Sequence, residues 1–271
     1  MAQYPSPVDQ LLTLGDPNEI SKFEKWPNYL ELGLGPEQIP DLIRMATDPE
    51  LNEADSENPG VWAPLHAWRA LGQLHADAAV QPLLTLLQRA DDHYDDWVSE
   101  ELPEVFALIG PAALPALAAN VADASRGTYF RAAIARALEL MAQRHPELRA
   151  QCVGMITGEL EKAENSNPEL NGLLIASLLD LGAEEAAPAM ERAFAAGRVD
   201  ESIAGNWEEV QYELGLREEP PQRPLSDAFR MADRMANLPV DRPPRDHKAK
   251  VKAKAKRKQA AKARKRNRKK K

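Results

Sequence analysis

The chain has 271 residues, of which 44% are hydrophobic and 6% aromatic, so it can bury a continuous core in one elongated domain or two ordinary ones. Its one cysteine, Cys152, excludes an intrachain disulfide and a thiolate cluster for structural zinc. The net charge of −8 averages two unlike parts, because residues 242–271 carry +16 and residues 1–241 carry −24.

The N-terminus has no basic region followed by an apolar run, and no stretch reaches the apolar length needed to cross a bilayer. A single cysteine also suits a reducing compartment. We therefore expect a cytoplasmic protein without a membrane partner.

The N-terminal part predicts short helices. Residues 8–46 contain three helical pieces, separated by breaks at 15–17 and 32–36. After the second break comes Pro40, followed by Leu and Ile one turn later. Residues 48–60 are acidic and rich in Pro and Gly, which is typical of a solvated loop.

The clearest stretch is a predicted helical hairpin at residues 65–87. Apolar residues at 67, 68, 71 and 74 mark one helix, and those at 80, 83, 84, 86 and 87 mark the next. Gly72 suits a left-handed C-cap region, although Gln73 and Leu74 extend the helical pattern past it. Asp77 is expected to cap the second helix. Each helix is too short to be stable alone, so neighbours must cover both.

The same pattern, a helix followed by a break and a second helix that begins with proline, recurs along the chain. Helices are predicted at 97–109, 130–143 and 170–182, with partners starting near Pro111, Pro146 and Pro188, and a sixth unit begins at Trp207. The second-helix prolines at 40, 82, 115 and 188 are 42, 33 and 73 residues apart, a mean of 37 when one degenerate unit is allowed. This period is typical of tetratricopeptide, HEAT and armadillo arrays, and the tetratricopeptide pattern is missing.

The run 71–84 (LGQLHADAAVQPLL) resembles the bacterial HEAT-like repeat also found in phycobilin lyases. More broadly, 61–215 resembles an uncharacterised bacterial family of HEAT-like proteins, with matching stretches at 96–103 and 193–200. Members of that family often end in a cysteine-rich SEC-C zinc motif. Those cysteines are absent here, so zinc binding is not expected. The resemblance implies a fold and almost nothing about function.

The expected fold is all-α, a HEAT-like α-solenoid in which helical hairpins form a right-handed superhelix, with a disordered basic C-terminal tail. Residues 1–215 would hold five repeats and a partial one, and 216–224 a Pro-rich linker. Residues 225–237 predict a capping or docking helix with Leu225, Phe229, Ala232 and Met235 on one face. Residues 238–271 cannot bury a core.

The basic tail is the sharpest candidate for binding. Such a run attracts phosphates through charge and counterion release, and without aromatic residues its binding to nucleic acid would be independent of sequence. The alternative is that the tail folds back on the acidic body, since tethering raises the effective concentration. The candidate contact residues are Lys254, Lys256, Arg257, Lys258, Arg264, Lys265, Arg266, Arg268 and Lys269.

A second candidate is the acidic segment 91–97 (DDHYDDW), joined by Glu100, Glu101 and Glu104. The spacing is not that of an EF-hand, so a solvated loop between repeats is favoured over a cation site. A third interpretation, ranked between the solvated loop and the cation site, is an acidic surface that contacts a basic protein. Its contact residues would be Asp91, Asp92, Asp95, Asp96 and Glu100.

Catalytic signatures are lacking: the five histidines have no ligand spacing, and neither a phosphate loop nor a nucleophile elbow is present. We assign no catalytic, metal or cofactor residue. The first hypothesis is a non-enzymatic scaffold, with an acidic surface for a protein partner and a tail for RNA, ribosomes or an acidic partner. The second is an enzyme or enzyme accessory on a HEAT scaffold, as the lyase resemblance allows, or a tail that regulates the acidic body. HEAT-like DNA glycosylases are a further precedent, but they present a basic concave surface and this body is acidic.

Overall fold

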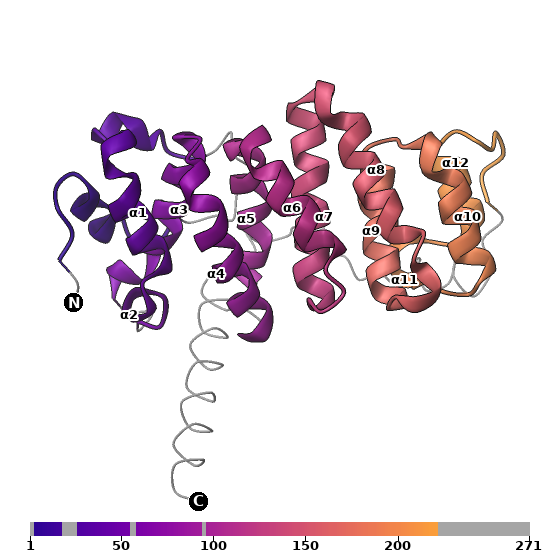
Figure 1. Cartoon of the computed structure of the whole chain (residues 1–271), viewed down its shortest axis with the longest axis horizontal. Coiled ribbons are helices and arrows are strands. Elements are labelled where there is room, and N and C mark those ends of the chain that lie inside the picture. Colours follow the sequence, from indigo (N-terminus) through magenta and orange to yellow (C-terminus); the bar gives the residue numbers. More distant parts are fainter. Residues whose placement is uncertain (1–2, 18–25, 55–57, 94–95, 222–271) are drawn as a thin grey trace, which may run out of the picture.

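The structure is a computed structural model that describes residues 3–17, 26–54, 58–93 and 96–221, and the side chains of 92–97 are not described. Every regular element within these ranges is helical, so the all-α prediction is confirmed. The helices follow one another in chain order along the longest axis of the molecule (Figure 1). The predicted helix 225–237 and the tail 238–271 lie outside the described residues.

The α-helices are α1 Ile39–Thr47, α2 Pro49–Asn52, α3 Ala63–Gln73, α4 Val80–His93, α5 Asp96–Ile109, α6 Leu114–Ala122, α7 Thr128–Arg144, α8 Arg149–Leu160, α9 Pro168–Asp180, α10 Ala187–Ala195, α11 Glu201–Ala204 and α12 Trp207–Glu213. The 3-10 helices are η1 Val8–Thr13, η3 Tyr29–Leu32, η4 Pro36–Gln38, η5 Pro59–Trp62, η6 Asp77–Ala79, η7 Pro111–Ala113, η8 Pro146–Leu148, η9 Ala163–Asn165 and η10 Glu184–Ala186.

Contacts join alternate helices. The helix α3 packs against α1 and α5, α5 against α7, and α7 against α9, while α6 contacts α8 and α8 contacts α10. The predicted acidic loop 48–60 is partly helical, since α2 lies within it and η5 begins at its end. The N-terminal pieces η1 and η3 both contact α3.

Each second helix begins in the same way, which the proline pattern only partly predicted. A three-residue 3-10 turn runs directly into α1, α4, α6, α8 and α10, as η4, η6, η7, η8 and η10. The prolines at 40, 82, 115 and 188 lie in the first turns of their α-helices, where the missing N–H leaves no hydrogen bond unmade. The degenerate unit keeps the turn, since Pro146 opens η8 directly before α8.

The left-handed residue at the end of α3 is His75, with φ of 49°, and not Gly72. Gly72 is helical and buried. The N–H groups of His75 and Ala76 donate to the carbonyls of Gly72 and Leu71 at 3.0 and 3.1 Å. This is a Schellman motif with the left-handed position three residues beyond Gly72. The ends of α9, α10 and α12 have the same bonds, with Gly182, Gly197 and Gly215 in that position.

Gly72 instead allows α3 and α5 to approach closely. A Cβ added at Gly72 would lie 3.2 Å from Leu108 Cδ1 and 3.5 Å from Val105 Cγ1. The predicted cap at Asp77 is also displaced, since the N-cap is Ala76 and the Asp77 carboxylate accepts only from the N–H of Ala78, at 2.7 Å. The sequence pattern predicted the place of the turn correctly, but it assigned the left-handed position and the helix cap to the wrong residues.

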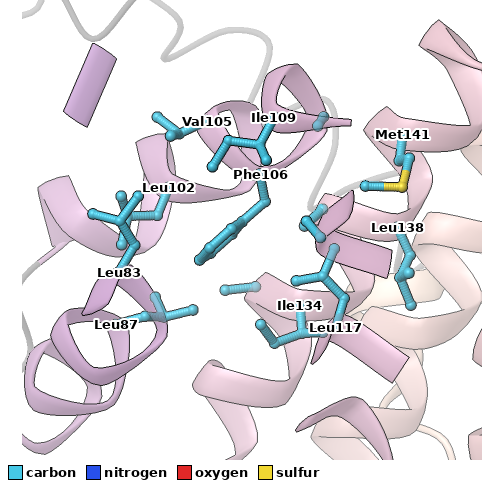
Figure 2. Close-up of a cluster of buried hydrophobic side chains, with 14 of the residues drawn as sticks. Leu83, Leu87, Leu102, Val105, Phe106, Ile109, Leu117, Ile134, Leu138 and Met141 are labelled. Atoms are coloured by element: carbon cyan, nitrogen blue, oxygen red, sulfur yellow. The ribbon is translucent and has the colours of Figure 1, made fainter. Parts of the chain in front are cut away.

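The core is continuous along the helices. In Figure 2, Phe106 of α5 points between side chains of its neighbours and is fully buried. The other labelled side chains of this cluster are Leu83 and Leu87 of α4, Leu102, Val105 and Ile109 of α5, Leu117 of α6, and Ile134, Leu138 and Met141 of α7. Trp62 and Trp68 are buried, and Trp207 packs against Phe194 with ring centroids 5.6 Å apart.

The C-terminal end differs from the predicted sixth unit. The helix α12 begins at Trp207 as predicted, but the short helix α11 precedes it and was not predicted. The two helices pack on different neighbours: α11 contacts α9, and α12 contacts α10. The predicted linker begins beside α12, where Arg217 Nη1 lies 3.2 Å from Glu208 Oε1.

Within the described ranges, no single helix has the length and apolar character needed to cross a membrane. One pair, Val98–Ile109 with Pro111–Ala122, meets those criteria only jointly and is bent by 110° between its members.

Candidate functional site

The acidic segment predicted as a loop is mostly helical, which corrects that prediction. Asp91 and Asp92 lie in the last turn of α4, and Asp96 is the first residue of α5. Asp91 is half-buried and Glu100 is exposed, whereas the side chains of Asp92, Asp95 and Asp96 lie outside the described part. Whether these residues contact a partner stays a prediction.

Glu101, which the sequence analysis grouped with this segment, is part of the interior. Its Oε2 accepts hydrogen bonds from Arg69 Nε at 2.9 Å and from Trp68 Nε1 at 3.2 Å, and its Oε1 accepts from Arg69 Nη2. Both charged side chains are 1% exposed. The Trp26 ring lies 4.8 Å from the Arg69 guanidinium carbon and covers the pair from the N-terminal side. The cluster therefore joins α3, α5 and the N-terminal segment.

Glu104 is also engaged, through an ion pair with Arg144 of α7. The helices α7 and α8 are joined similarly: Arg131 Nη2 donates to Glu159 Oε2 at 2.8 Å, and both side chains are nearly buried. A buried charge is tolerated only when it is paired. Since the partners of these ion pairs lie on different helices, the pairs hold those helices together. Glu101 and Glu104 therefore belong to helix packing rather than to a docking surface.

Another polar cluster ties the N-terminal segment to α3. His66 Nε2 lies 2.9 Å from the carbonyl oxygen of Gly15, which can only accept, so Nε2 carries the hydrogen. His66 Nδ1 then accepts from the Tyr29 hydroxyl at 2.7 Å. The Gln73 side chain forms two hydrogen bonds with the backbone of this N-terminal segment. It accepts from the Tyr29 N–H at 2.9 Å and donates to the Pro27 carbonyl at 2.8 Å.

Burial shifts the ionisation of this cluster. Desolvation, together with a smaller effect of the nearby Arg69 charge, lowers the pKa of His66 to about 4, so the imidazole is neutral at pH 7. Desolvation likewise raises the pKa of Tyr29 to about 12. A neutral histidine and a protonated tyrosine, both fully bonded within the fold, are structural groups.

His75 lies in the turn that follows α3. Its Nδ1 donates to the Leu108 carbonyl at 2.6 Å, near the C-terminal end of α5. The carbonyls in the last turn of a helix have no partner within it, so His75 supplies one. The bond joins the α3–α4 turn to the next helix.

The remaining candidate groups are also structural. Cys152 is fully buried, and desolvation raises the pKa of its thiol to about 11, so the thiolate that reacts or binds metal is not formed. Among the residues that the structure describes, no three or more His, Cys, Asp or Glu side chains are grouped to hold a metal ion.

The C-terminal end of the described chain carries several exposed carboxylates, which the sequence analysis did not single out. Several basic side chains of the body are used in ion pairs with its own carboxylates: Arg44, Arg69, Arg126, Arg131, Arg136, Arg144, Arg149, Lys162, Arg192 and Arg217. The exposed carboxylates between residues 184 and 219 that lie outside these ion pairs are Glu184, Glu191, Glu201, Glu213, Glu218 and Glu219. Their density between 184 and 219 was a usable signal. We call these six the C-terminal acidic surface.

The tail residues predicted to contact nucleic acid, from Lys254 to Lys269, lie outside the described residues. Comparisons of the chain with models of known protein families, with curated proteins and with solved structures found no match.

Proposed function

We propose that this protein is a non-enzymatic interaction scaffold built on HEAT-like helical repeats. Its acidic repeat surface binds a basic protein partner, and its tail binds the phosphates of nucleic acid. The repeat assignment is supported by the recurring 3-10 turn before each second helix and by the contacts between alternate helices. The stack that these contacts form would be a right-handed solenoid.

The observation that carries the proposal is the unequal use of the two kinds of charge. Arginines pair with carboxylates at helix contacts, as in Arg69–Glu101 and Arg131–Glu159, while the surplus carboxylates face solvent. A surface with one sign of unpaired charge attracts and orients a partner of opposite sign. The C-terminal acidic surface is therefore the proposed contact for a basic protein.

The enzyme hypothesis receives less support from the same residues. The carboxylates buried in the described part are Glu101, Glu139 and Glu159, and each forms an ion pair with an arginine. A general acid or base must be able to exchange its proton with a substrate. Carboxylates held in ion pairs, between helices for Glu101 and Glu159 and within α7 for Glu139, are better suited to stabilising the fold.

The tail is tested with full-length protein and a variant lacking residues 242–271, each titrated with RNA and with duplex DNA over a salt series. Full-length protein should bind without sequence preference, with affinity falling steeply as salt rises. The truncated protein should lose this binding. Equal, salt-insensitive binding by both proteins would refute the role of the tail.

The acidic surface is tested separately with a synthetic Lys/Arg-rich peptide and the protein lacking 242–271, which removes competition from the tail. Changing Glu184, Glu191 and Glu201 to Gln should weaken peptide binding at low salt by at least about tenfold. The matched control changes Asp9, Glu37 and Glu53, at the other end of the chain. An equal effect of both sets would mean that net charge alone, and not this surface, attracts the peptide.

A further inference from the structure

One polar face of α3 holds the N-terminal part of the chain in place. His66, Arg69 and Gln73 recur at intervals of three and four residues, so they lie along one face of the helix. We call residues 26–34, which include η3, the N-terminal strap. His66 and Gln73 are hydrogen-bonded to this strap, and Arg69 lies over the ring of Trp26. The strap is therefore attached to α3 by polar contacts as well as by its buried apolar side chains.

His66 lies within a buried chain of hydrogen bonds. Its Nε2–H donates to the Gly15 carbonyl at 2.9 Å, and its Nδ1 accepts from the Tyr29 hydroxyl at 2.7 Å. The Tyr29 oxygen in turn accepts from Arg69, which also donates to Glu101 of α5. In this arrangement the neutral imidazole and the phenol are both satisfied.

Protonation of His66 would disrupt this chain. An imidazolium donates from both ring nitrogens, so Nδ1 can no longer accept from the Tyr29 hydroxyl. The Tyr29 oxygen would then face two donors, and its own hydrogen would need a new acceptor. The imidazolium would also lie close to the Arg69 guanidinium at a site where His66 is 2% exposed, and like charges repel strongly in such surroundings.

The charges around His66 oppose its protonation on balance. Burial, with a smaller effect of the Arg69 charge, lowers the pKa of His66 to about 4, although the Gly15 hydrogen bond and the Asp16 charge act in the opposite direction. Tyr29 and Glu101 are the other ionisable groups of the chain of hydrogen bonds. On the other elements that pack against α3, Asp41 and Arg44 of α1 pair with each other, Glu50 of α2 and Asp9 of η1 are exposed, and η5 has no ionisable side chain.

We propose that the N-terminal strap is a pH-sensitive closure, which protonation of His66 releases from α3 while the rest of the helical body stays folded. Both hydrogen-bond partners of His66, Gly15 and Tyr29, belong to the N-terminal part of the chain, whereas Arg69 is anchored to Glu101. The repulsion is therefore relieved by moving the N-terminal part, and not by separating α3 from α5. Release uncovers the polar face of α3.

Hydrogen exchange of the full-length protein, followed residue by residue by NMR, tests the proposal. The Tyr29 amide is the reporter, because it donates to Gln73 Oε1 on α3 and loses this bond when the strap leaves. With a His66 pKa of about 4 in the closed state and 6.5 after release, the released state should be about 30-fold more populated at pH 5 than at pH 7.5. The protection factor of the Tyr29 amide should fall by this ratio. At both pH values it should be at least about tenfold lower than that of the best-protected amides of α5.

Three variants assign the response. His66→Gln has no titratable side chain at this place, so the Tyr29 amide should keep one protection factor at both pH values. His75→Asn is the matched control, because His75 also bonds a backbone carbonyl, that of Leu108 in α5, and it should keep the pH response. Tyr29→Phe removes only the hydroxyl and should lower the protection of the same amide at pH 7.5 by at least about twofold.

An equal protection factor of the Tyr29 amide at pH 7.5 and pH 5 would overturn the proposal, and so would a pH response that persists in His66→Gln. Equal protection of this amide and of the amides of α5 would mean that the strap opens only when the whole body unfolds, which would also overturn it. So would an unchanged protection factor in Tyr29→Phe, because the hydroxyl would then not hold the strap.

Discussion

Arg69 of α3 and Glu101 of α5 form an ion pair in which each side chain is 1% exposed. The pair is held by two Arg69 nitrogens and by the indole N–H of Trp68, all bonded to one carboxylate. Ions placed in a low-dielectric interior lose their hydration, and only this network offsets the loss. The contact of two neighbouring helices therefore depends on both partners being present.

Removing one partner should be far more costly than removing both. Glu101→Gln or Arg69→Met should lower the free energy of unfolding by about 3–5 kcal/mol, because each leaves a buried charge unpaired. The double variant Arg69→Met/Glu101→Leu should cost much less than the sum of the single changes. Urea denaturation of the four proteins measures the coupling. Arg192→Met, which breaks an exposed pair with Glu161, is the control and should cost under about 1 kcal/mol.

The His66 cluster predicts a pH dependence of stability. The folded pKa of about 4 lies below the ordinary value of 6.5, so between these values the unfolded chain binds a proton that the folded protein does not. Stability should therefore fall as the pH drops from 6.5 to 4, by about 3 kcal/mol in total, and not change further below that from this group. The comparison is with His66→Gln, which loses the Tyr29 contact at all pH values. The difference in unfolding free energy between the two proteins should shrink across this window, and a constant difference would contradict the prediction.

The turn after α3 predicts an unusual order of substitutions at His75. A left-handed conformation costs an L-residue about 1 kcal/mol relative to glycine, and the bond from His75 to Leu108 offsets part of that cost. His75→Gly should be nearly neutral, because it loses the bond but relieves the strain. His75→Ala loses the bond and keeps the strain, so it should be less stable than His75→Gly by about 1 kcal/mol. Thermal unfolding gives the order, and an alanine variant as stable as the glycine variant would contradict it.

Two helical glycines should respond oppositely to alanine. Gly158 of α8 faces open space, so Gly158→Ala should stabilise the protein by about 0.5–1 kcal/mol through helix propensity. At Gly72 the new methyl group would lie 3.2 Å from Leu108 Cδ1 and 3.4 Å from its Cβ. Gly72→Ala should therefore destabilise by about 1–3 kcal/mol despite the same gain in propensity. Denaturation midpoints of the two variants decide this, and a stabilising Gly72→Ala would show that α3 and α5 can separate freely.

Much of the secondary structure could be predicted because its causes are local. Apolar residues at helical spacing marked α3, α4, α5, α7 and α9, and the prolines marked where second helices begin. The short helix α11 was not predicted because its four residues are too few to show a period. Gly72 was given the wrong role because a glycine near a helix end looks the same whether it turns the chain or admits a neighbouring helix.

The sequence by itself determined the helical class of the protein, the turns that punctuate it and the opposite charges of its two parts. These follow from the spacing and composition of neighbouring residues. Only the tertiary structure decided which charges face solvent. Glu100 and Glu101 are adjacent in sequence, yet Glu100 is exposed and Glu101 meets an arginine 32 residues away. Burial depends on which helix face meets which neighbour, so charge that looks like a binding surface in the sequence can be part of the core.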